Sequence, residues 1–389
     1  MSRWWVRLRR TLIDSLGMAI VLALRVVRPI ILVRFGGLRN DRIGHLSFEP
    51  ELYLCERDAD VHRKPTVDVF FLYGEPPCNR QLARMWQRRL HVWRAAAYLD
   101  MRNRRVPGHE VHTIALRSSR HEDPHDFLGR TPPHLTFTKS EQEFGEAECR
   151  SLGIARDQPF VCFMNRDAAY MTTVFGGQKE ARHIHRNSHI ENYVEAAREL
   201  TQRGYVALRM GARVEAPLST SDAGIVDYAS RNRSEFMDVY LCAHCRFLIA
   251  PILGFCGLAY VFRRPLLIVN AIPLVNVTFV RRVGDLFIPK KCWLTSERRF
   301  MTFKEILQAP ARHESHEYVE SGIEVVENSA EEIAAATAEM DERLRGTWRP
   351  TEEDEDLQRR FWALFGLDTV AARMRIGSDY LRSHKELLN

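Results

Sequence analysis

The chain has 389 residues and a net charge of +6, and 45% of its residues are hydrophobic. This length exceeds one ordinary core and predicts two domains, while the composition excludes wholesale disorder. Residues 1–35 hold seven arginines and one acid, which leaves 49 basic and 49 acidic residues elsewhere, so a nucleic-acid partner is not expected.

The leader, residues 1–28, has the composition of a membrane-surface helix. Trp4 and Trp5 suit the level of lipid headgroups, and the arginines suit anionic lipid. The uninterrupted apolar run over 16–24 is shorter than the roughly 20 residues needed to cross a bilayer. We therefore expect a basic amphipathic helix that holds the protein at the cytoplasmic face of the inner membrane. The alternative is an ordinary helix packed on the first domain; no small-residue cleavage site supports a signal peptide.

The eight cysteines show no disulfide framework. Cys242 and Cys245 form one isolated C-x-x-C pair, and a structural zinc site needs four ligands. We expect reduced thiols, a cytoplasmic setting, and neither a metal nor a cofactor.

Strand-like and helix-like segments alternate along the chain, which predicts an α/β fold with parallel sheets. The segments expected to be strands lie over residues 30–35, 67–73, 111–116, 159–164, 205–210, 246–250 and 266–270. Helices are expected over 81–99, 140–152 and 351–366, after a capping box of Ser188 with Glu191, and after Ser234. The loop over 165–187 is long enough to suggest function.

The first candidate site follows the first strand. Gly36 and Gly37 would let the backbone turn beside a ligand, although their spacing does not match the dinucleotide fingerprint. Asp41 and His45 lie four residues apart, so both would face one cleft if helical. Either could deprotonate an acceptor hydroxyl. The alternative reading is a helix start with Asp41 paired to a neighbouring arginine.

The second half offers candidate anion contacts at strand ends. Arg186 and Asn187 precede a helix start, where free backbone donors can meet a phosphate. Arg209, followed by Gly211, ends a buried strand and could neutralise a leaving diphosphate. The turn holding Gly254 and Gly257 forms a weaker anion cradle, for which an ordinary structural turn is the alternative.

Several blocks of residues in one order resemble a bacterial family of glycosyltransferases found with surface-polysaccharide and lipopolysaccharide genes. The resemblance runs from about Val33 to the C-terminus and is carried by Arg34-Phe-Gly, Asp41-Arg-Ile-Gly-His45, Phe163-x-Asn-Arg-Asp167, Arg186-Asn-Ser-x-Ile-Glu-Asn-Tyr193, Arg209-Met-Gly211, Asp227-Tyr228, Ser234-x-Phe-Met-Asp238 and Phe262-Arg-Arg-Pro265. It implies a GT-B arrangement of two Rossmann-like domains, with the nucleotide on the C-terminal one and no required metal. The turn over 251–257 departs from the family in having no serine, which leaves only its backbone donors for phosphate.

On this basis the sequence predicts a metal-independent glycosyltransferase that moves a sugar from a nucleotide-diphosphate donor to a surface-glycan or lipid-linked acceptor. Asp227 and Tyr228 are expected near the nucleotide. The expected domains are the leader 1–28, an acceptor domain over 29–155, a donor domain over 156–345, and C-terminal helices over 346–389 that return to the first domain. The alternatives are a non-catalytic membrane-associated scaffold and a sugar-nucleotide epimerase of similar shape.

Overall fold

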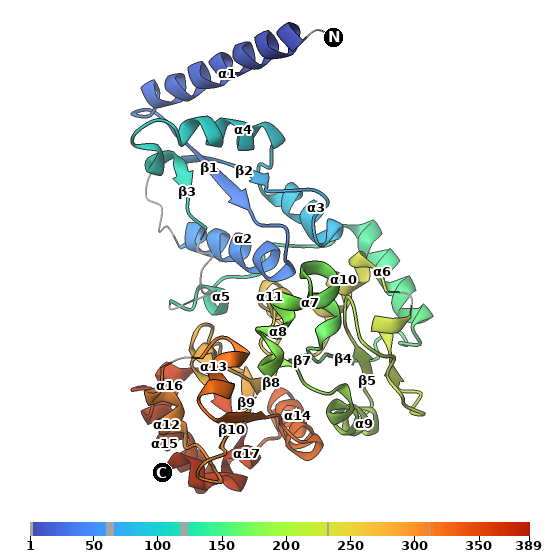
Figure 1. Cartoon of the computed structure of the whole chain (residues 1–389). Coiled ribbons are helices and arrows are strands. Elements are labelled where there is room, and N and C mark those ends of the chain that lie inside the picture. Colours follow the sequence, from blue (N-terminus) through green and yellow to red (C-terminus); the bar gives the residue numbers. More distant parts are fainter. Residues whose placement is uncertain (1–2, 60–65, 117–122, 124, 232, 311) are drawn as a thin grey trace. The chain divides into compact units, whose positions relative to one another are not determined.

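Figure 1 shows a computed structural model of the chain, which describes residues 3–59, 66–116, 123, 125–231, 233–310 and 312–389. The chain forms two compact units. Unit 1 consists of residues 1–121 and 131–136, and unit 2 of residues 122–130 and 137–389.

Unit 1 is built on a three-stranded parallel sheet in the order β2–β1–β3. Its elements are α1 (Arg3–Val26), β1 (Leu32–Leu38), α2 (Ile43–Asp58), β2 (Thr66–Leu72), α3 (Arg80–Arg89), α4 (Arg94–Asn103), the 3-10 turn η1 (His109–His112) and β3 (Thr113–Ile114). The α/β class with parallel strands is confirmed here, and β1 and β2 overlap the strands expected over 30–35 and 67–73. The strand expected over 111–116 is only the two-residue β3, because residues 109–112 form a 3-10 turn.

The two glycines expected to form a turn lie inside β1 instead. A Cβ on Gly36 would come within 2.7 Å of the Phe70 ring, and one on Gly37 within 2.4 Å of the Tyr73 ring. The glycines therefore let aromatic rings lie against the strand, which is a packing role. The turn itself is formed by later residues, and Asn40 fixes it by donating to the carbonyl of Gly74 at 2.5 Å.

The single helix expected over 81–99 is broken into α3 and α4. Between them the chain is extended and pairs with β2: the amide of Phe70 donates to the carbonyl of His91, and the amide of Trp93 donates to that of Phe70, both at 2.8 Å. The helical periodicity of the sequence continues through this break, so only the tertiary pairing reveals it.

The leader is helical over Arg3–Val26, and one side of this helix packs on α4. A Cβ added at Gly17 would lie 2.6 Å from the Tyr98 ring, Tyr98 donates to Asp14 at 2.6 Å, and Val21 is 2% exposed. Leu12 and Leu16 lie on the opposite side of the helix and are exposed, and Ile20 is exposed on the flank. The helix therefore packs on unit 1, as the alternative reading expects, and its other side carries exposed apolar side chains. Among the described residues, no helix has the length and apolar character needed to cross a membrane.

Unit 2 contains a seven-stranded sheet in the order β13–β9–β8–β7–β4–β5–β6, with every neighbouring pair parallel. The chain starts in the middle at β4, builds outward through β5 and β6, and then returns to the other side of β4 at β7. The strand order therefore reverses between β4 and β7. In open parallel sheets such a reversal leaves a crevice at the carboxyl ends of the strands, where ligands bind.

The strands of this sheet are β4 (Phe160–Phe163), β5 (Val206–Arg209), β6 (Ile225–Val226), β7 (Leu248–Ala250), β8 (Leu266–Ala271), β9 (Leu286–Pro289) and β13 (Arg375–Ile376). A small antiparallel sheet contains β10 (Lys291–Leu294), β11 (Arg299–Phe300) and β12 (Ile323–Val326). The α-helices are α5 (Phe127–Arg130), α6 (Lys139–Ser151), α7 (Ala168–Phe175), α8 (Gly177–Ala181), α9 (Val194–Gln202), α10 (Glu235–His244), α11 (Cys256–Val261), α12 (Phe303–Gln308), α13 (Ser315–Glu320), α14 (Ala330–Arg345), α15 (Glu352–Ala363), α16 (Thr369–Ala372) and α17 (Ser378–Ser383). The 3-10 turns are η2 (Ile184–Arg186), η3 (Ile190–Tyr193), η4 (Tyr228–Ser230), η5 (Leu274–Thr278) and η6 (Lys385–Leu388).

Two expected helix starts have different outcomes. Ser234 caps α10 by accepting from the amide of Met237 at 3.1 Å, as its position predicts. Ser188 caps nothing, because η3 intervenes before α9 and its hydroxyl pairs with that of Tyr193 at 3.1 Å. The buried tyrosine competes for this hydroxyl, which the local sequence pattern cannot show.

The C-terminal segment was expected to pack on the N-terminal domain, but it belongs to unit 2. It supplies β13, which pairs with β9, and Gln358 of α15 donates to the carbonyl of Ile376 at 2.6 Å. His384 pairs with Glu332 of α14 at 2.6 Å. The segment therefore completes the edge of the large sheet.

Candidate functional site

Three cations lie where the strand order of unit 2 reverses. Arg166 and Arg186 belong to the long segment after β4, and Lys290 directly follows β9. Arg186 donates to the carbonyl of Ile252, just beyond β7, and Lys290 donates to the carbonyl of Asn187. Side chains from the segments after β4 and β9 thus meet the backbone beyond β7, at the edge of the sheet where the topology predicts a crevice.

Two of these cations form no close ion pair among the described residues, although Glu180 is near enough to Arg186, and Glu327 to Lys290, to favour their charged forms. Arg166 pairs with Glu180 at 3.0 Å, but within the described part of the chain neither Arg186 nor Lys290 forms an ion pair. Lys290 is only 5% exposed. A buried charge is costly unless it is paired, so this arrangement leaves a positive site suited to an anion.

The surrounding pKa values report the same positive field. Burial lowers the pKa of Lys290 to about 8, and nearby Arg166 contributes in the same direction, although Glu327 opposes them. Burial and Arg166 lower the pKa of Arg186 to about 10. Burial, followed by the charges of Arg186, His183, Lys290 and Arg166, lowers the pKa of His185 to about 3. His185 is therefore neutral at pH 7, and the two cations remain available to an anion.

A polar network holds this segment in place. Arg166 donates to the side-chain oxygen of Asn187 and to the carbonyl of His183, the latter at 3.0 Å. Asn187 in turn donates to Glu180 at 2.7 Å. The side chain of Asn187 is therefore engaged within the protein, and it positions the backbone that meets Lys290.

A cavity of about 180 Å³ adjoins Lys290. Its lining is largely apolar, including Ile272, Met301 and Ile306, with Arg312 and Tyr318 as further polar groups. The Tyr318 ring lies 4.9 Å from that of His185, so the cavity and the cation cluster are contiguous. Pockets that enclose a whole small ligand measure roughly 300–1,000 Å³, so this one suits a single ring system.

The structure places Arg209 at the end of β5, as predicted, but turns it toward protein groups. Its side chain is 1% exposed, donates to the carbonyl of Ala216 at 2.8 Å, and lies 3.6 Å from Asp227. Asp227 also accepts from the amide of Leu218 at 2.8 Å. Gly211 is packed closely, since an added Cβ would lie 2.7 Å from Val214. These residues hold the loop after β5.

The remaining predicted contacts also have structural partners. Tyr228 is fully buried, and its hydroxyl bonds with Ser234 and with Asp238 at 3.0 Å. In the glycine turn, the amide of Gly257 donates to the carbonyl of Gly254 at 3.1 Å. The amide of Cys256 likewise donates to the carbonyl of Leu253, so these two donors of the expected anion cradle are engaged within the turn, and Arg186 meets the carbonyl of Ile252 just before it.

In unit 1, His45 lies in the first turn of α2 and pairs through Nδ1 with Glu49, one helical turn further on. The Glu49 side chain is 1% exposed and that of His45 is 12% exposed. A buried carboxylate that orients a histidine ring is the arrangement of many general bases. Asp41 precedes the helix, and its 53%-exposed side chain lies 3.7 Å from Arg39 and 3.8 Å from Arg42. The two candidate bases thus have different surroundings, and only His45 has a buried orienting partner.

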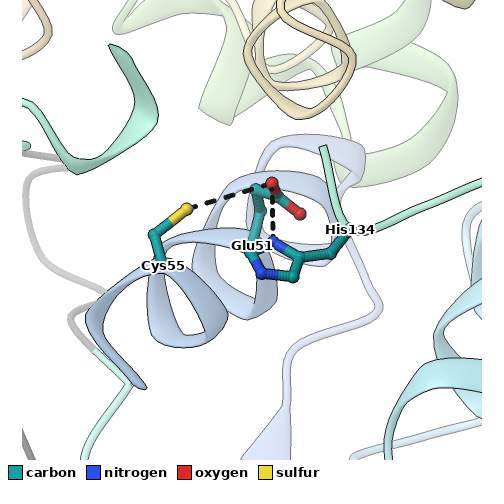
Figure 2. Close-up of side chains that lie close together, drawn as sticks. All are labelled: Glu51, Cys55 and His134. Atoms are coloured by element: carbon teal, nitrogen blue, oxygen red, sulfur yellow. Dashed lines mark hydrogen bonds and ion pairs between the residues drawn. The ribbon is translucent and has the colours of Figure 1, made fainter. Parts of the chain in front are cut away.

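Further along α2, three potential metal ligands converge. Figure 2 shows Glu51 and Cys55 on the helix facing His134, which comes from a separate segment. The nearest atoms are His134 Nδ1 and Glu51 Oε1, 3.0 Å apart. The sequence predicted a metal-independent enzyme, and this group of three potential metal ligands contradicts that part of the prediction.

Comparison with known proteins gives weak similarities. No protein-family model matches, and no curated protein matches. The chain is similar to the E. coli ADP-heptose lps heptosyltransferase II, with 15% identity over 61% of this chain and 84% of that one, at a TM-score of 0.35. It is also similar to a family 9 glycosyl transferase from Veillonella parvula, with 10% identity, coverage of 61% and 80%, and a TM-score of 0.37.

A third solved structure is the dodecameric iron-containing heptosyltransferase TibC of enterotoxigenic E. coli, solved with ADP-D-beta-D-heptose. Its identity is 13% over 82% of this chain and 77% of that one, at a TM-score of 0.40. TM-scores of this size carry no functional argument.

Sequence reasoning missed Lys290, Arg166 and Glu49. Lys290 follows the apolar run of β9, which has the same strand-then-cation pattern that identified Arg209. Glu49 lies four residues after His45, a spacing that places both on one helix face. Both signals were present in the sequence.

Proposed function

We propose that this protein is a glycosyltransferase that moves a sugar from a nucleoside-diphosphate donor to a surface-glycan or lipid-linked acceptor. Unit 2 binds the donor and unit 1 supplies the base. The observation that carries the proposal is the pair of cations without carboxylate partners, Arg186 and Lys290, at the reversal point of a parallel sheet.

The chemistry of the donor matches this site. A nucleoside diphosphate brings two phosphates and a nucleobase joined by a ribose. The crevice offers two cations that form no ion pair, beside a cavity of about 180 Å³ that suits a single ring system such as the base. During transfer the bond between the sugar and the diphosphate breaks, so negative charge grows on the leaving oxygen. Arg186 and Lys290 would stabilise that charge, and the desolvation around them would strengthen the interaction.

His45 would activate the acceptor. As the acceptor oxygen bonds to the sugar, its proton passes to the ring nitrogen of His45 that does not face Glu49. The carboxylate of Glu49 stabilises the imidazolium that forms. The proton thus leaves the acceptor, the nucleoside diphosphate leaves the sugar, and no further reactant is needed.

Thermal denaturation against UDP, GDP, ADP, dTDP and CMP tests the donor site. A nucleotide that binds only the folded protein stabilises it by about 2.7 kcal/mol at roughly 100 times its dissociation constant. We expect one diphosphate to raise the melting temperature clearly. A folded sample that responds to none of them would refute the donor site, and turnover of the matching nucleotide sugar without any acceptor would favour the epimerase alternative.

We also propose that α1 holds the protein at the cytoplasmic surface of the inner membrane. Leu12 and Leu16 are each 63% exposed, on the side of the helix opposite to the α4 contact. Each apolar side chain of this size contributes about 1.5–3 kcal/mol when it is removed from water. A lipid-linked acceptor would then be held at high local concentration.

Sedimentation with anionic phosphatidylglycerol vesicles tests this placement. The double variant Leu12→Ser with Leu16→Ser should bind at least about 100-fold more weakly than the parent, because two apolar contacts with lipid are lost. Val370→Ser is the matched control, since Val370 is 83% exposed in unit 2. Equal vesicle binding by the parent and the double variant would remove α1 from the membrane contact.

A further inference from the structure

The group on α2 noted above has the geometry of a metal centre. Glu51 and Cys55 are one helical turn apart on the same face of α2, and His134 reaches them from residues 131–136 of the same unit. The ligand atoms of the three residues all lie within 4.8 Å of one another. All three side chains are buried, so they form a defined cluster inside unit 1.

The separations match those of atoms that share one ion. His134 Nδ1 lies 3.0 Å from Glu51 Oε1, and Cys55 Sγ lies 3.9 Å from the same oxygen. In a tetrahedral zinc site with ordinary bond lengths, neighbouring ligand atoms are about 3.3–3.5 Å apart. Shifts of about half an ångström would therefore bring the imidazole and the thiol to these separations from the Glu51 oxygen, and all three atoms already lie within 4.8 Å of one another.

A fourth residue holds the histidine in the orientation that a metal requires. Asp58 Oδ2 lies 2.9 Å from His134 Nε2, so this nitrogen can donate its proton to Asp58 while Nδ1 faces Glu51 and Cys55. Metal-bound histidines usually donate their second N–H to a carboxylate, which fixes the ring and raises its basicity. Asp58 is in position for this role.

We propose that Glu51, Cys55 and His134 bind one zinc-class divalent ion, with Asp58 orienting His134. Thiolate, imidazole and carboxylate are the ligand types that zinc accepts in proteins. Three protein ligands leave one tetrahedral position to a non-protein ligand. Because α2 also carries His45 and Glu49, the ion would tie the helix that bears the base to the segment 131–136.

The competing state of this cluster contains no metal. In it, a protonated His134 lies between the carboxylates of Glu51 and Asp58, and the Cys55 thiol donates weakly to Glu51. This ion-paired state does not need the thiol to be ionised. A test that follows the thiolate therefore separates the two states.

The experiment uses the full chain, stripped with a chelator and titrated with Zn²⁺ and Co²⁺ alone. We expect one metal per chain, a rise in melting temperature with Zn²⁺, and a thiolate-to-cobalt charge-transfer band. Cys55→Ser should lose the band and weaken zinc binding by at least about 100-fold, and Asp58→Asn should weaken it by about 10- to 100-fold. Cys149→Ser is the matched control, since Cys149 is a buried thiol of unit 2.

The parent protein alone can distinguish the metal-bound cluster from the ion-paired cluster, even if a variant does not fold. The cobalt spectrum and the zinc stoichiometry of the parent protein need no substitution. Absence of the charge-transfer band, or an unchanged melting temperature with Zn²⁺, would show that the cluster is only an ion pair. Undiminished zinc binding by a folded Cys55→Ser would overturn the assignment equally. Neither readout depends on nucleotide binding, so this proposal and the proposed function fail independently.

Discussion

Lys290→Met should weaken nucleoside-diphosphate binding by about 100-fold and at the same time stabilise the free protein. The amine is buried without a carboxylate partner, and burial lowers its pKa to about 8. Removing a cation that contacts phosphate in a desolvated site costs about 2–5 kcal/mol of binding. Removing an uncompensated buried charge relieves strain in the free protein, by about 1–2 kcal/mol here. Titration calorimetry and thermal denaturation of the same sample measure both effects.

The pH dependence of the parent protein provides a second readout. The folded-state pKa of Lys290, about 8, lies below the 10.5 of an unperturbed lysine, so the unfolded chain binds more protons between these values. Stability should therefore rise with pH over that window, while nucleotide affinity falls above about pH 8 as the amine loses its charge. Both trends should disappear in Lys290→Met.

Lys304→Met is the matched control, because Lys304 is exposed on α12. This control should bind and melt like the parent. If Lys290→Met binds nucleotide as tightly as the parent does, or melts at a lower temperature, the anion site lies elsewhere.

The framework of the fold could be predicted because burial leaves a strong local signal. Residues 160–163 form a continuous apolar run, as do 206–208 and 266–269, and parallel strands covered on both faces require this. The two-residue strands β6 and β13 could not be predicted, since they are strands only through pairing with their neighbours. The same is true of the break between α3 and α4, which the pairing with β2 creates.

The donor site shows why single motifs locate a site only in part. Arg186 could be predicted from its own surroundings, but its significance depends on Lys290, whose amine meets the carbonyl of Asn187 across 103 residues of sequence. Arg209 has the same local pattern of strand, cation and glycine, yet its charge is occupied by Asp227 and Ala216. The two arginines differ in their position relative to the strand reversal between β4 and β7. Arg186 reaches the carbonyl of Ile252 beyond β7, whereas Arg209 ends β5, on the other side of β4. Only the order of the strands reveals this difference.

His45→Gln should lower the transfer rate by about 10²- to 10⁴-fold without changing the affinity for the nucleotide. General-base catalysis typically contributes this factor, and glutamine can keep a hydrogen bond with Glu49 but cannot take up the acceptor proton. The rate is measured as release of nucleoside diphosphate from the stabilising nucleotide sugar in the presence of a membrane lipid extract. Affinity is measured separately by calorimetry, so a loss of folding or of donor binding would be detected.

Two further variants separate the roles on α2. Glu49→Gln should give a smaller fall in rate than His45→Gln, since it removes the charge that stabilises the imidazolium but keeps the base. Asp41→Asn tests the other candidate base, whose carboxylate is 53% exposed and lies beside Arg39 and Arg42. If Asp41→Asn abolishes transfer while His45→Gln retains it, the base is Asp41 and the His45–Glu49 pair is structural. The reverse pattern assigns proton transfer to His45. We expect this reverse pattern, because the exposed carboxylate of Asp41 has no buried group to fix its orientation, whereas His45 has Glu49.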